Sequence, residues 1–263
     1  MRLACYTLDA FTDRVFGGNP AAVCPLEEWL DEGLMQNIAS ENNLAETAFF
    51  VPDGDGYHIR WFTPTNEVEL CGHATLASAY VIFNYLSPDK HNLRFRAQAG
   101  ELRVSREGEA GVLSLDFPSR PPEPVEPDPR IVDALGGASP SETWKARDHL
   151  YVFKTEAEVR ALKPDFARLR AVEMYALTVT APGDDCDFVS RFFAPGHGID
   201  EDPVTGSAHC TLIPFWAKRL GKNVLHARQV SRRGGELFCE LKGDRVKIAG
   251  HVALYAKSTL TLG

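Results

Sequence analysis

Two stretches half a chain apart indicate how this protein folds. Residues 60–64 read RWFTP and residues 191–195 read RFFAP, an offset of 131 positions in a chain of 263 residues. The same offset pairs Cys71 with Asp202. The identities are few, and a chance match is the alternative. A strand, a proline-containing loop and a helix of small residues nevertheless follow one another in the same order both times. This repetition predicts an internal duplication.

The hydrophobic pattern around these stretches contains both strand and helix signals. Apolar residues alternate with a period of two in several runs, which is typical of strands with one buried face; these runs are residues 4–10, 57–61, 102–104, 113–117, 246–248 and 252–254. Residues 73–86 and 206–220 are apolar or small on most sides and predict two buried helices, the second kinked at Pro214.

A third helix is predicted near the N-terminus. Leu26, Leu30, Leu34 and Ile38 recur every four residues, as on a surface helix with one apolar stripe. Pro25 suits the first turn of such a helix because its missing N–H has no partner there in any case.

A proline-rich segment predicts the domain boundary. Residues 118–129 read PSRPPEPVEPDP, in which a hydrogen-bonded ladder is disfavoured. We expect an N-terminal domain over residues 1–118, joined by the last strand at about 252–263, and a C-terminal domain over 119–251. A long loop within one domain is the alternative. Small-molecule sites tend to lie between domains, so we expect the active-site cleft there.

Composition excludes several functional classes. The net charge of −8 argues against a nucleic-acid binder, which needs clustered positive charge. The apolar runs are shorter than the roughly 20 residues of a membrane span. Asp9 interrupts the N-terminal run too early for a signal peptide, so we expect a cytoplasmic protein without membrane contact. The six cysteines form no CxxC pair for zinc or dithiol chemistry.

The two junctions between strand and buried helix are the candidate chemical sites. Residues 67–75 read EVELCGHAT, and residues 200–209 read DEDPVTGSAH. Each places a glycine, Gly72 or Gly206, where a helix begins, so that a ligand can approach free N–H groups with partial positive charge. Such an end binds anions without lysine or arginine. Plain capping by Thr205 or Ser207 is the alternative for the second junction.

Glu46 is the candidate acid or base. It is the single carboxylate of residues 43–51, which read NLAETAFFV, and alternation puts it on the face of Ala48 and Phe50. Apolar surroundings raise the pKa of a carboxyl group and so favour proton transfer near neutral pH. An exposed strand end is the alternative.

Taken together, these motifs resemble the phenazine-biosynthesis isomerase-like family, whose fold is that of diaminopimelate epimerase. The resemblance runs from about residue 5 to the end of the chain, and the motifs that carry it are GNPAAV at 18–23, NLAETAF at 43–49, FTP at 62–64, CGHAT at 71–75 and EDPVTGSA at 201–208. It implies an α+β fold of two similar, pseudo-symmetric domains, each a barrel-like β-sheet around a central helix.

The resemblance also implies a function for particular residues. Glu46, His73 and Asp202 match catalytic positions, while Asn19, Cys71, Gly72, Gly206 and Ser207 are expected to bind substrate. It implies a cofactor-independent isomerase without metal, which moves a proton within a small anionic substrate, and a homodimer. We further expect Asp202 to orient His73 and to stay ionised.

Two other functions remain open from the sequence. Epimerase relatives use two cysteines, and this chain keeps Cys71 but has Asp202 at the second position, so a two-thiol mechanism is disfavoured. An amino-acid epimerase or racemase that pairs Cys71 with Asp202 or Glu46 is the first alternative. A non-catalytic small-molecule binding protein is the second.

Overall fold

The chain passes from one compact unit to another at its proline-rich segment. A computed structural model describes residues 1–108 and 111–262. Unit 1 comprises Met1–Phe117 and Ala249–Gly263, and unit 2 comprises Pro118–Ile248. The proline-rich segment is not a bare linker, because Glu123–Pro124 forms strand β9, which pairs with β10 (Glu142–Lys145), and Pro129 begins helix α3 (Pro129–Ala134).

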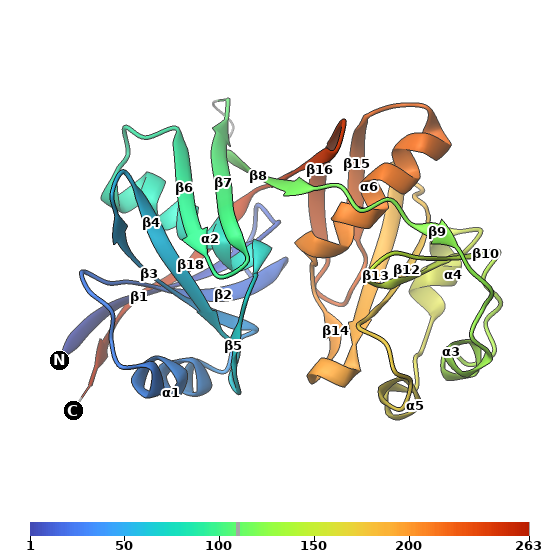
Figure 1. Cartoon of the computed structure of the whole chain (residues 1–263), viewed down its shortest axis with the longest axis horizontal. Helices are drawn as coiled ribbons and strands as arrows, with labels where there is room; N and C mark the ends of the chain where they lie inside the picture. Colours follow the sequence, from blue (N-terminus) through green and yellow to red (C-terminus); the bar gives the residue numbers. More distant parts are fainter. Residues whose placement is uncertain (109–110, 263) are drawn as a thin grey trace. The chain divides into compact units, whose positions relative to one another are not determined.

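Unit 1 is a mixed sheet closed by the two ends of the chain. Its strands are β1 (Arg2–Ala10), β2 (Asn19–Pro25), β3 (Glu46–Asp53), β4 (Gly56–Phe62), β5 (Glu67–Val68), β6 (Asn92–Ala97), β7 (Gly100–Glu107), β8 (Val112–Pro118) and β18 (Val252–Thr261). Strands β1 and β2 are antiparallel, β2 and β3 parallel, and β3 and β4 antiparallel. β4 then pairs antiparallel with β5 and parallel with β6, and β18 lies antiparallel to β1 (Figure 1).

Unit 2 repeats this order of pairing. Besides β9 and β10 its strands are β11 (His149–Val152), β12 (Leu177–Pro182), β13 (Phe188–Ala194), β14 (Ile199–Asp202), β15 (Val224–Gln229), β16 (Gly235–Lys242) and β17 (Arg245–Gly250). β10 and β11 are antiparallel, β11 and β12 parallel, and β12 and β13 antiparallel. β13 pairs antiparallel with β14 and parallel with β15, as β4 does with β5 and β6. The predicted internal duplication is confirmed by this topology.

Each unit packs its strands against one buried helix. Helix α2 (Gly72–Val81), continued by a π-helical turn at Ile82–Leu86, contacts β1, β2, β3 and β18. Of its ten residues only Gly72 and Tyr80 are not buried. Helix α6 (Gly206–Leu220) has eleven buried residues and contacts β15 and β16. Both predicted buried helices are therefore confirmed, and Pro214 lies inside α6.

The predicted helix around residues 26–38 is wrong in its start. Pro25 ends β2, and helix α1 covers only Glu32–Asn42. Asp31 is its N-cap and accepts a hydrogen bond from the Leu34 N–H, which satisfies a free donor of the first turn. Leu26 packs in the same apolar cluster as Met35 and Ile38, but it lies in the loop before α1. Its spacing from the other leucines therefore matches a helical stripe although it is not helical.

Three short helices with side-chain caps pack on the core of unit 2. Helix α4 (Glu156–Ala161) begins with a capping box at Thr155, and α5 (Phe166–Arg170) begins at Asp165. They pack with α3 on the core of unit 2, to which Val159 and Leu169 contribute. Within the described residues no helix has the length and apolarity that crossing a membrane requires.

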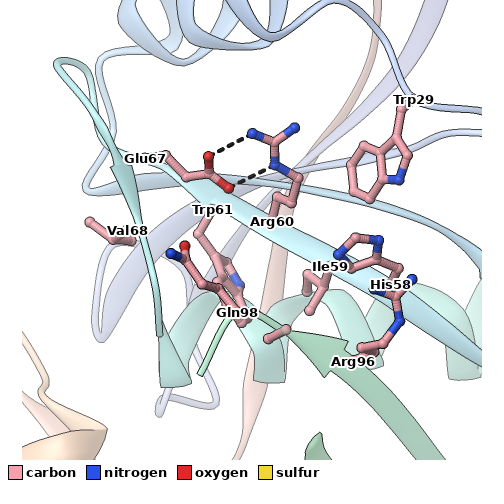
Figure 2. A pocket seen from close by; sticks show the side chains of 10 residues that line it. Trp29, His58, Ile59, Arg60, Trp61, Glu67, Val68, Arg96 and Gln98 are labelled. Carbon is pink, nitrogen blue, oxygen red and sulfur yellow. Dashed lines mark hydrogen bonds and ion pairs between the residues drawn. The ribbon is translucent and has the colours of Figure 1, made fainter. Parts of the chain in front are cut away.

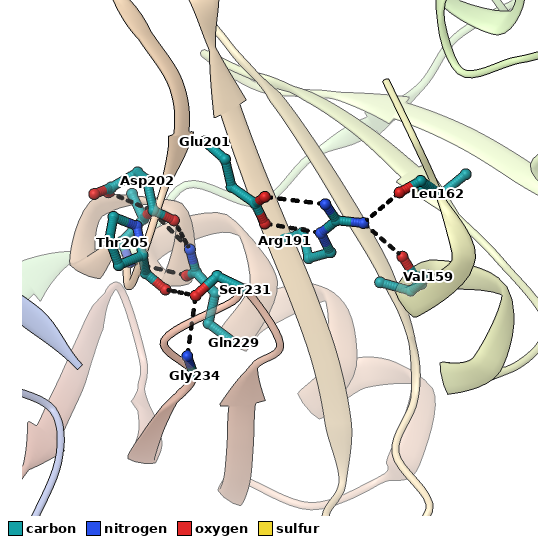
Figure 3. A network of polar contacts seen from close by, with 10 residues as sticks. Val159, Leu162, Arg191, Glu201, Asp202, Thr205, Gln229, Ser231 and Gly234 are labelled. Carbon is teal, nitrogen blue, oxygen red and sulfur yellow. Dashed lines mark hydrogen bonds and ion pairs between the residues drawn. The ribbon is translucent and has the colours of Figure 1, made fainter. Parts of the chain in front are cut away.

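An arginine–glutamate pair occupies the same place in both units. Arg60 on β4 donates to Glu67 on β5 through Nε and Nη2, at 2.7 and 2.6 Å (Figure 2). Arg191 on β13 donates to both oxygens of Glu201 on β14, at 2.8 and 3.0 Å (Figure 3). Each pair joins the strand that carries the repeated motif to the strand that leads into the buried helix, and so fixes the position of that junction.

Strand β4 also borders a cavity of about 390 Å³ in unit 1. β4 pairs with β6 at Tyr57 and His58 and with β5 at Trp61 and Phe62, so its partner changes midway. The lining comes from β4, from β5, from the end of β6 and from Trp29 (Figure 2). It does not include Glu46, Cys71 or His73.

Candidate functional site

Four predicted site residues meet in unit 1, at the start of three elements. Glu46 is the first residue of β3, and Asn19 is the first residue of β2. These two strands are parallel, so their N-terminal ends lie at the same edge of the sheet. Cys71 and His73 stand at the first turn of α2, which packs against both strands. Asn19, Glu46, Cys71 and His73 are all buried. We call them the unit 1 cluster.

His73 is at the centre of the unit 1 cluster. Its Nε2 lies 3.1 Å from the Glu46 Oε2. Its Nδ1 lies 3.2 Å from the Asn19 Nδ2 and 3.5 Å from the Cys71 Sγ. Both ring nitrogens therefore have partners from unit 1, and these set the tautomer and orientation of the ring. Asp202 belongs to unit 2, so its expected role in orienting His73 stays a prediction.

Charge in the unit 1 cluster favours a protonated imidazole. Burial lowers the pKa of His73, but negative charge at Cys71 and Glu46 outweighs burial and raises it well above its usual value. Burial raises the pKa of the Cys71 thiol to about 11, and the negative charge of Glu46 adds to this effect. Cys71 and Glu46 thus both act against burial to favour the imidazolium form of His73. A protonated Nδ1 also needs an acceptor, which Asn19 supplies when its amide presents the oxygen.

The same side chains carry metal-binding atoms. One donor atom each from Glu46, Cys71 and His73 lies within 4.8 Å of the others. Carboxylate, thiolate and imidazole are all zinc ligands, but a bound thiol must first lose its proton. Without a metal, burial raises the pKa of the Cys71 thiol to about 11. The ion pair of His73 and Glu46 is the arrangement that the residues themselves favour.

Asp202 lies in a second network of polar contacts, in unit 2. The Thr205 hydroxyl donates to the Asp202 Oδ2 at 2.5 Å, and the Gln229 Nε2 donates to the Asp202 carbonyl oxygen at 2.7 Å (Figure 3). Gln229 also accepts from the Thr205 N–H at 2.8 Å. Gln229 is 1% exposed, so the strand end at Asp202 is tied to the interior of unit 2.

The neighbours of Asp202 have separate roles. Glu201 accepts from Arg191, whose Nη1 also donates to the Val159 and Leu162 carbonyl oxygens at 3.1 and 2.8 Å. Asp200 forms an exposed pair with Arg170. The acidic run at 200–202 is therefore not one solvated patch, because Glu201 belongs to the framework and Asp200 to the surface.

The two buried helices differ from the others in how they begin. Asp31, Asp128, Thr155 and Asp165 cap α1, α3, α4 and α5 through their side chains. Cys71 before α2 and Thr205 before α6 make no such hydrogen bond. Plain capping is therefore not the role of Thr205, which donates to Asp202 instead. The first N–H groups at Gly72 and Gly206 keep their capacity for an anion.

An arginine stands at the start of α6, where the sequence predicted an anion site without one. The Arg147 Nη2 donates to the Ser207 Oγ at 3.2 Å from a turn 60 residues earlier in the chain. Nothing near residue 147 in the sequence signals this contact, and the same holds for Gln229. Thr205 lies within the motif at residues 200–209, but its position there indicates only an N-cap.

One further histidine lies next to the unit 2 network but does not suit proton transfer near neutral pH. His209 is 0% exposed, and its Nδ1 lies 2.8 Å from the Thr205 carbonyl oxygen. That oxygen can only accept, so the Nδ1 carries the hydrogen. Burial lowers the pKa of His209 to about 4, so the ring is neutral at physiological pH.

The structure thus groups the predicted residues by unit. Asn19, Glu46, Cys71, Gly72 and His73 lie in unit 1, whereas Asp202, Gly206 and Ser207 lie in unit 2. Each group sits where a strand leads into the buried helix of its unit. The catalytic and binding roles of all eight stay predictions.

Comparisons with known proteins agree with this architecture. The family model described as phenazine biosynthesis-like protein matches residues 8–258. An uncharacterized isomerase of Pseudomonas aeruginosa is 50% identical, over 100% of both chains. A crystal structure of a phenazine biosynthesis protein of the PhzF family from Enterococcus faecalis is 49% identical, covers 100% of both chains and has a TM-score of 0.96.

A more distant structure supports the predicted fold class. A hydroxyproline epimerase from Agrobacterium vitis covers 98% of this chain and 92% of its own, with a TM-score of 0.64 and 8% identity. At that identity the likeness concerns the fold alone, and it confirms the expected epimerase-like α+β architecture. By the family model and the close relatives together, the chain belongs to the phenazine biosynthesis-like family.

Proposed function

We propose that this chain is a cofactor-independent isomerase that moves a proton within a small carboxylate-bearing substrate, with Glu46 as the general acid and base. The observation that carries the proposal is the buried pair of Glu46 and His73, 3.1 Å apart. A buried carboxylate fixed by one neighbour is a suitable proton-transfer group. Membership of a family with relatives named isomerases supports the reaction class.

The proposed reaction is a proton shift without net gain or loss. The Glu46 carboxylate accepts a proton from a substrate carbon, and the electron pair of the broken C–H bond moves into the adjoining unsaturated system. Glu46 then returns the proton to a different carbon of the same substrate. The imidazolium of His73 stays protonated beside Glu46 and stabilises the negative charge that develops in the substrate.

Binding of the substrate carboxylate is proposed for the two uncapped helix starts. Gly72 and His73 offer N–H groups in unit 1, and Gly206 and Ser207 offer them in unit 2. We propose that both groups act on one substrate molecule, with Asn19 and Cys71 lining its pocket. Asp202 is proposed as the catalytic carboxylate that unit 2 contributes.

An epimerase that uses Cys71 is the second candidate. The 3.5 Å separation between the Cys71 Sγ and the His73 Nδ1 favours it, because His73 could accept the thiol proton. The pKa of about 11 opposes it, since little thiolate forms at neutral pH. Blocking of Cys71 by a thiol reagent, with protection by substrate and loss of turnover in Cys71→Ser, would favour the epimerase.

Exchange of substrate hydrogen with the solvent tests the main proposal. The full chain is incubated in deuterium oxide with small unsaturated and 2-amino carboxylic acids, and the acid that gains mass is identified by mass spectrometry. Glu46→Gln should lower the exchange rate about 10²- to 10⁴-fold, as loss of a general acid or base does. Exposed Glu41→Gln on α1 is the control and should exchange normally. Equal rates in Glu46→Gln and the wild type would end the assignment of Glu46, and lack of exchange in every acid would favour a binding protein.

The charge on His73 should depend on Glu46. Because the pKa of His73 is raised, its imidazolium persists above pH 6.5, and the stability that the ion pair adds is lost as the pH rises through the raised pKa. Glu46→Gln removes one of the charges that raise the pKa of His73, so this pKa should fall below that of the wild type. An NMR titration of the His73 ring measures both values. A wild-type His73 that loses its proton below pH 6.5 would contradict the ion pair.

Three neighbouring carboxylates should respond differently to removal of their charge. Asp202→Asn should lower kcat at least about tenfold with little change in KM, because the proposal places it at the reaction. Asp200→Asn should change neither, since its pair with Arg170 is exposed. Glu201→Gln should lower the melting temperature, because Arg191 is only 11% exposed and would lose its partner. Identical behaviour of all three variants would remove Asp202 from the site.

A homodimer is proposed by analogy with the family, since two-fold dimers are the commonest soluble oligomers. Sedimentation equilibrium at micromolar concentration should give about twice the chain mass of 29.0 kDa. A single species at the mass of one chain would exclude the dimer.

A further inference from the structure

The guanidinium of Arg147 is positioned beside the first turn of α6 by contacts within unit 2. Arg147 lies in the turn between β10 and β11, and its Nη2 donates to the Ser207 Oγ at 3.2 Å. Ser207 is the second residue of α6. The arginine therefore brings a full positive charge to a helix end that already carries a partial one.

Two other contacts fix the plane of this guanidinium. Its Nε and Nη2 donate to the two oxygens of Asp148, at 2.8 and 3.1 Å. Its Cζ lies 4.1 Å from the centroid of the Tyr175 ring, which is close enough for a cation–π contact. The Asp148 side chain is only 4% exposed, so it is a firm anchor. Arginine binds in this two-point manner and lysine does not.

The third nitrogen of Arg147 is left for a ligand. Within the described part of the chain no hydrogen bond is found for the Arg147 Nη1, while Nε and Nη2 both donate. The side chain keeps 29% of its surface exposed, in contrast to Asp148. Asp148 balances the positive charge of Arg147. The ion pair alone therefore does not account for the additional hydrogen bond from Arg147 to Ser207.

We propose that Arg147 binds the anionic group of the substrate directly through its Nη1, next to the Ser207 hydroxyl. The inference rests on the proposed function in that it places a substrate at Ser207, and it makes that substrate an acid rather than a neutral amide or ester. Asp148 and Tyr175 are positioning residues, because they act through Arg147. The anion site of unit 2 is thus built from a fixed cation together with the helix end.

Binding of an acid and of its uncharged amide tests the proposal without knowledge of the substrate. Benzoate and benzamide have nearly the same size and shape, and the affinity of each for the full chain is measured by isothermal titration calorimetry at low salt. Benzoate should bind wild-type protein at least about tenfold more tightly than benzamide, which is the effect of one hydrogen bond to a charged group. No preference for benzoate, or no measurable benzoate binding, overturns the proposal.

Variants assign the preference to Arg147. Arg147→Gln with Asp148→Asn removes both charges and leaves no unpaired buried carboxylate, so the ratio of the two affinities should fall to about one. Arg147→Lys keeps the charge but loses the two-point contact with Asp148, and the ratio should fall at least about threefold. Arg168→Gln is the matched control, because Arg168 is an exposed arginine paired with Asp165 in the same unit, and it should keep the wild-type ratio.

The outcomes separate this inference from the proposed isomerase. A wild-type ratio in a folded double variant overturns the role of Arg147, and so does a wild-type ratio in Arg147→Lys if the double variant does not fold. A purely structural role of Arg147 would weaken both ligands equally and leave the ratio unchanged. Lack of hydrogen exchange in every acid would remove the isomerase while leaving the preference for benzoate intact.

Discussion

The structure depends on one constraint, which is that each unit packs around a helix that is buried on nearly all sides. Helices α2 and α6 are enclosed by their own units, but Gly72 and Ser207 in their first turns are only half-buried. Cys71 and Thr205, at their N-cap positions, make no capping hydrogen bond, although the four shorter or more exposed helices are all capped. The candidate site residues lie around these two helix starts.

The duplication has produced similar frameworks with different chemistry. The strand pairing and the arginine–glutamate pairs recur, because each unit needs the same junction between strand and buried helix. The side chains around the junction do not recur. Unit 1 gathers Glu46, His73 and Cys71, which can exchange protons. Unit 2 holds Asp202, which can also exchange a proton, and Arg147, which cannot lose its charge.

Much of the framework could be predicted from the sequence, because it rests on local patterns. The two buried helices show themselves as long runs of small and apolar residues, and most strands show a period of two. The repeated motif at 60–64 and 191–195 indicated the duplication, although it did not reveal that Glu67 and Glu201 pair with its arginines. The predicted start of the helix near Leu26 was wrong because it relied on the spacing of the leucines. Asp31, a typical N-cap residue, marks the true start.

The candidate site was harder to predict from the sequence than the framework, for a physical reason. Glu46 and His73 stand out locally, one as a lone carboxylate in an apolar strand and the other beside a glycine. The partners that decide their chemistry come from elsewhere, since Asn19 reaches His73 across 54 residues and Arg147 reaches Ser207 across 60. No periodicity encodes such contacts, because they arise only when the sheet has closed.

The pairing of β1 with β18 has a consequence for the order in which the chain folds during synthesis. Arg2 lies opposite Thr261, so unit 1 needs residues from both extremes of the described chain, whereas unit 2 is continuous from Pro118 to Ile248. The ribosome makes residues 252–261 after all of unit 2. Domains fold as units as they emerge. Unit 2 can therefore fold first. Until β18 is made, one edge of β1 stays unpaired and can pair with strands of other chains.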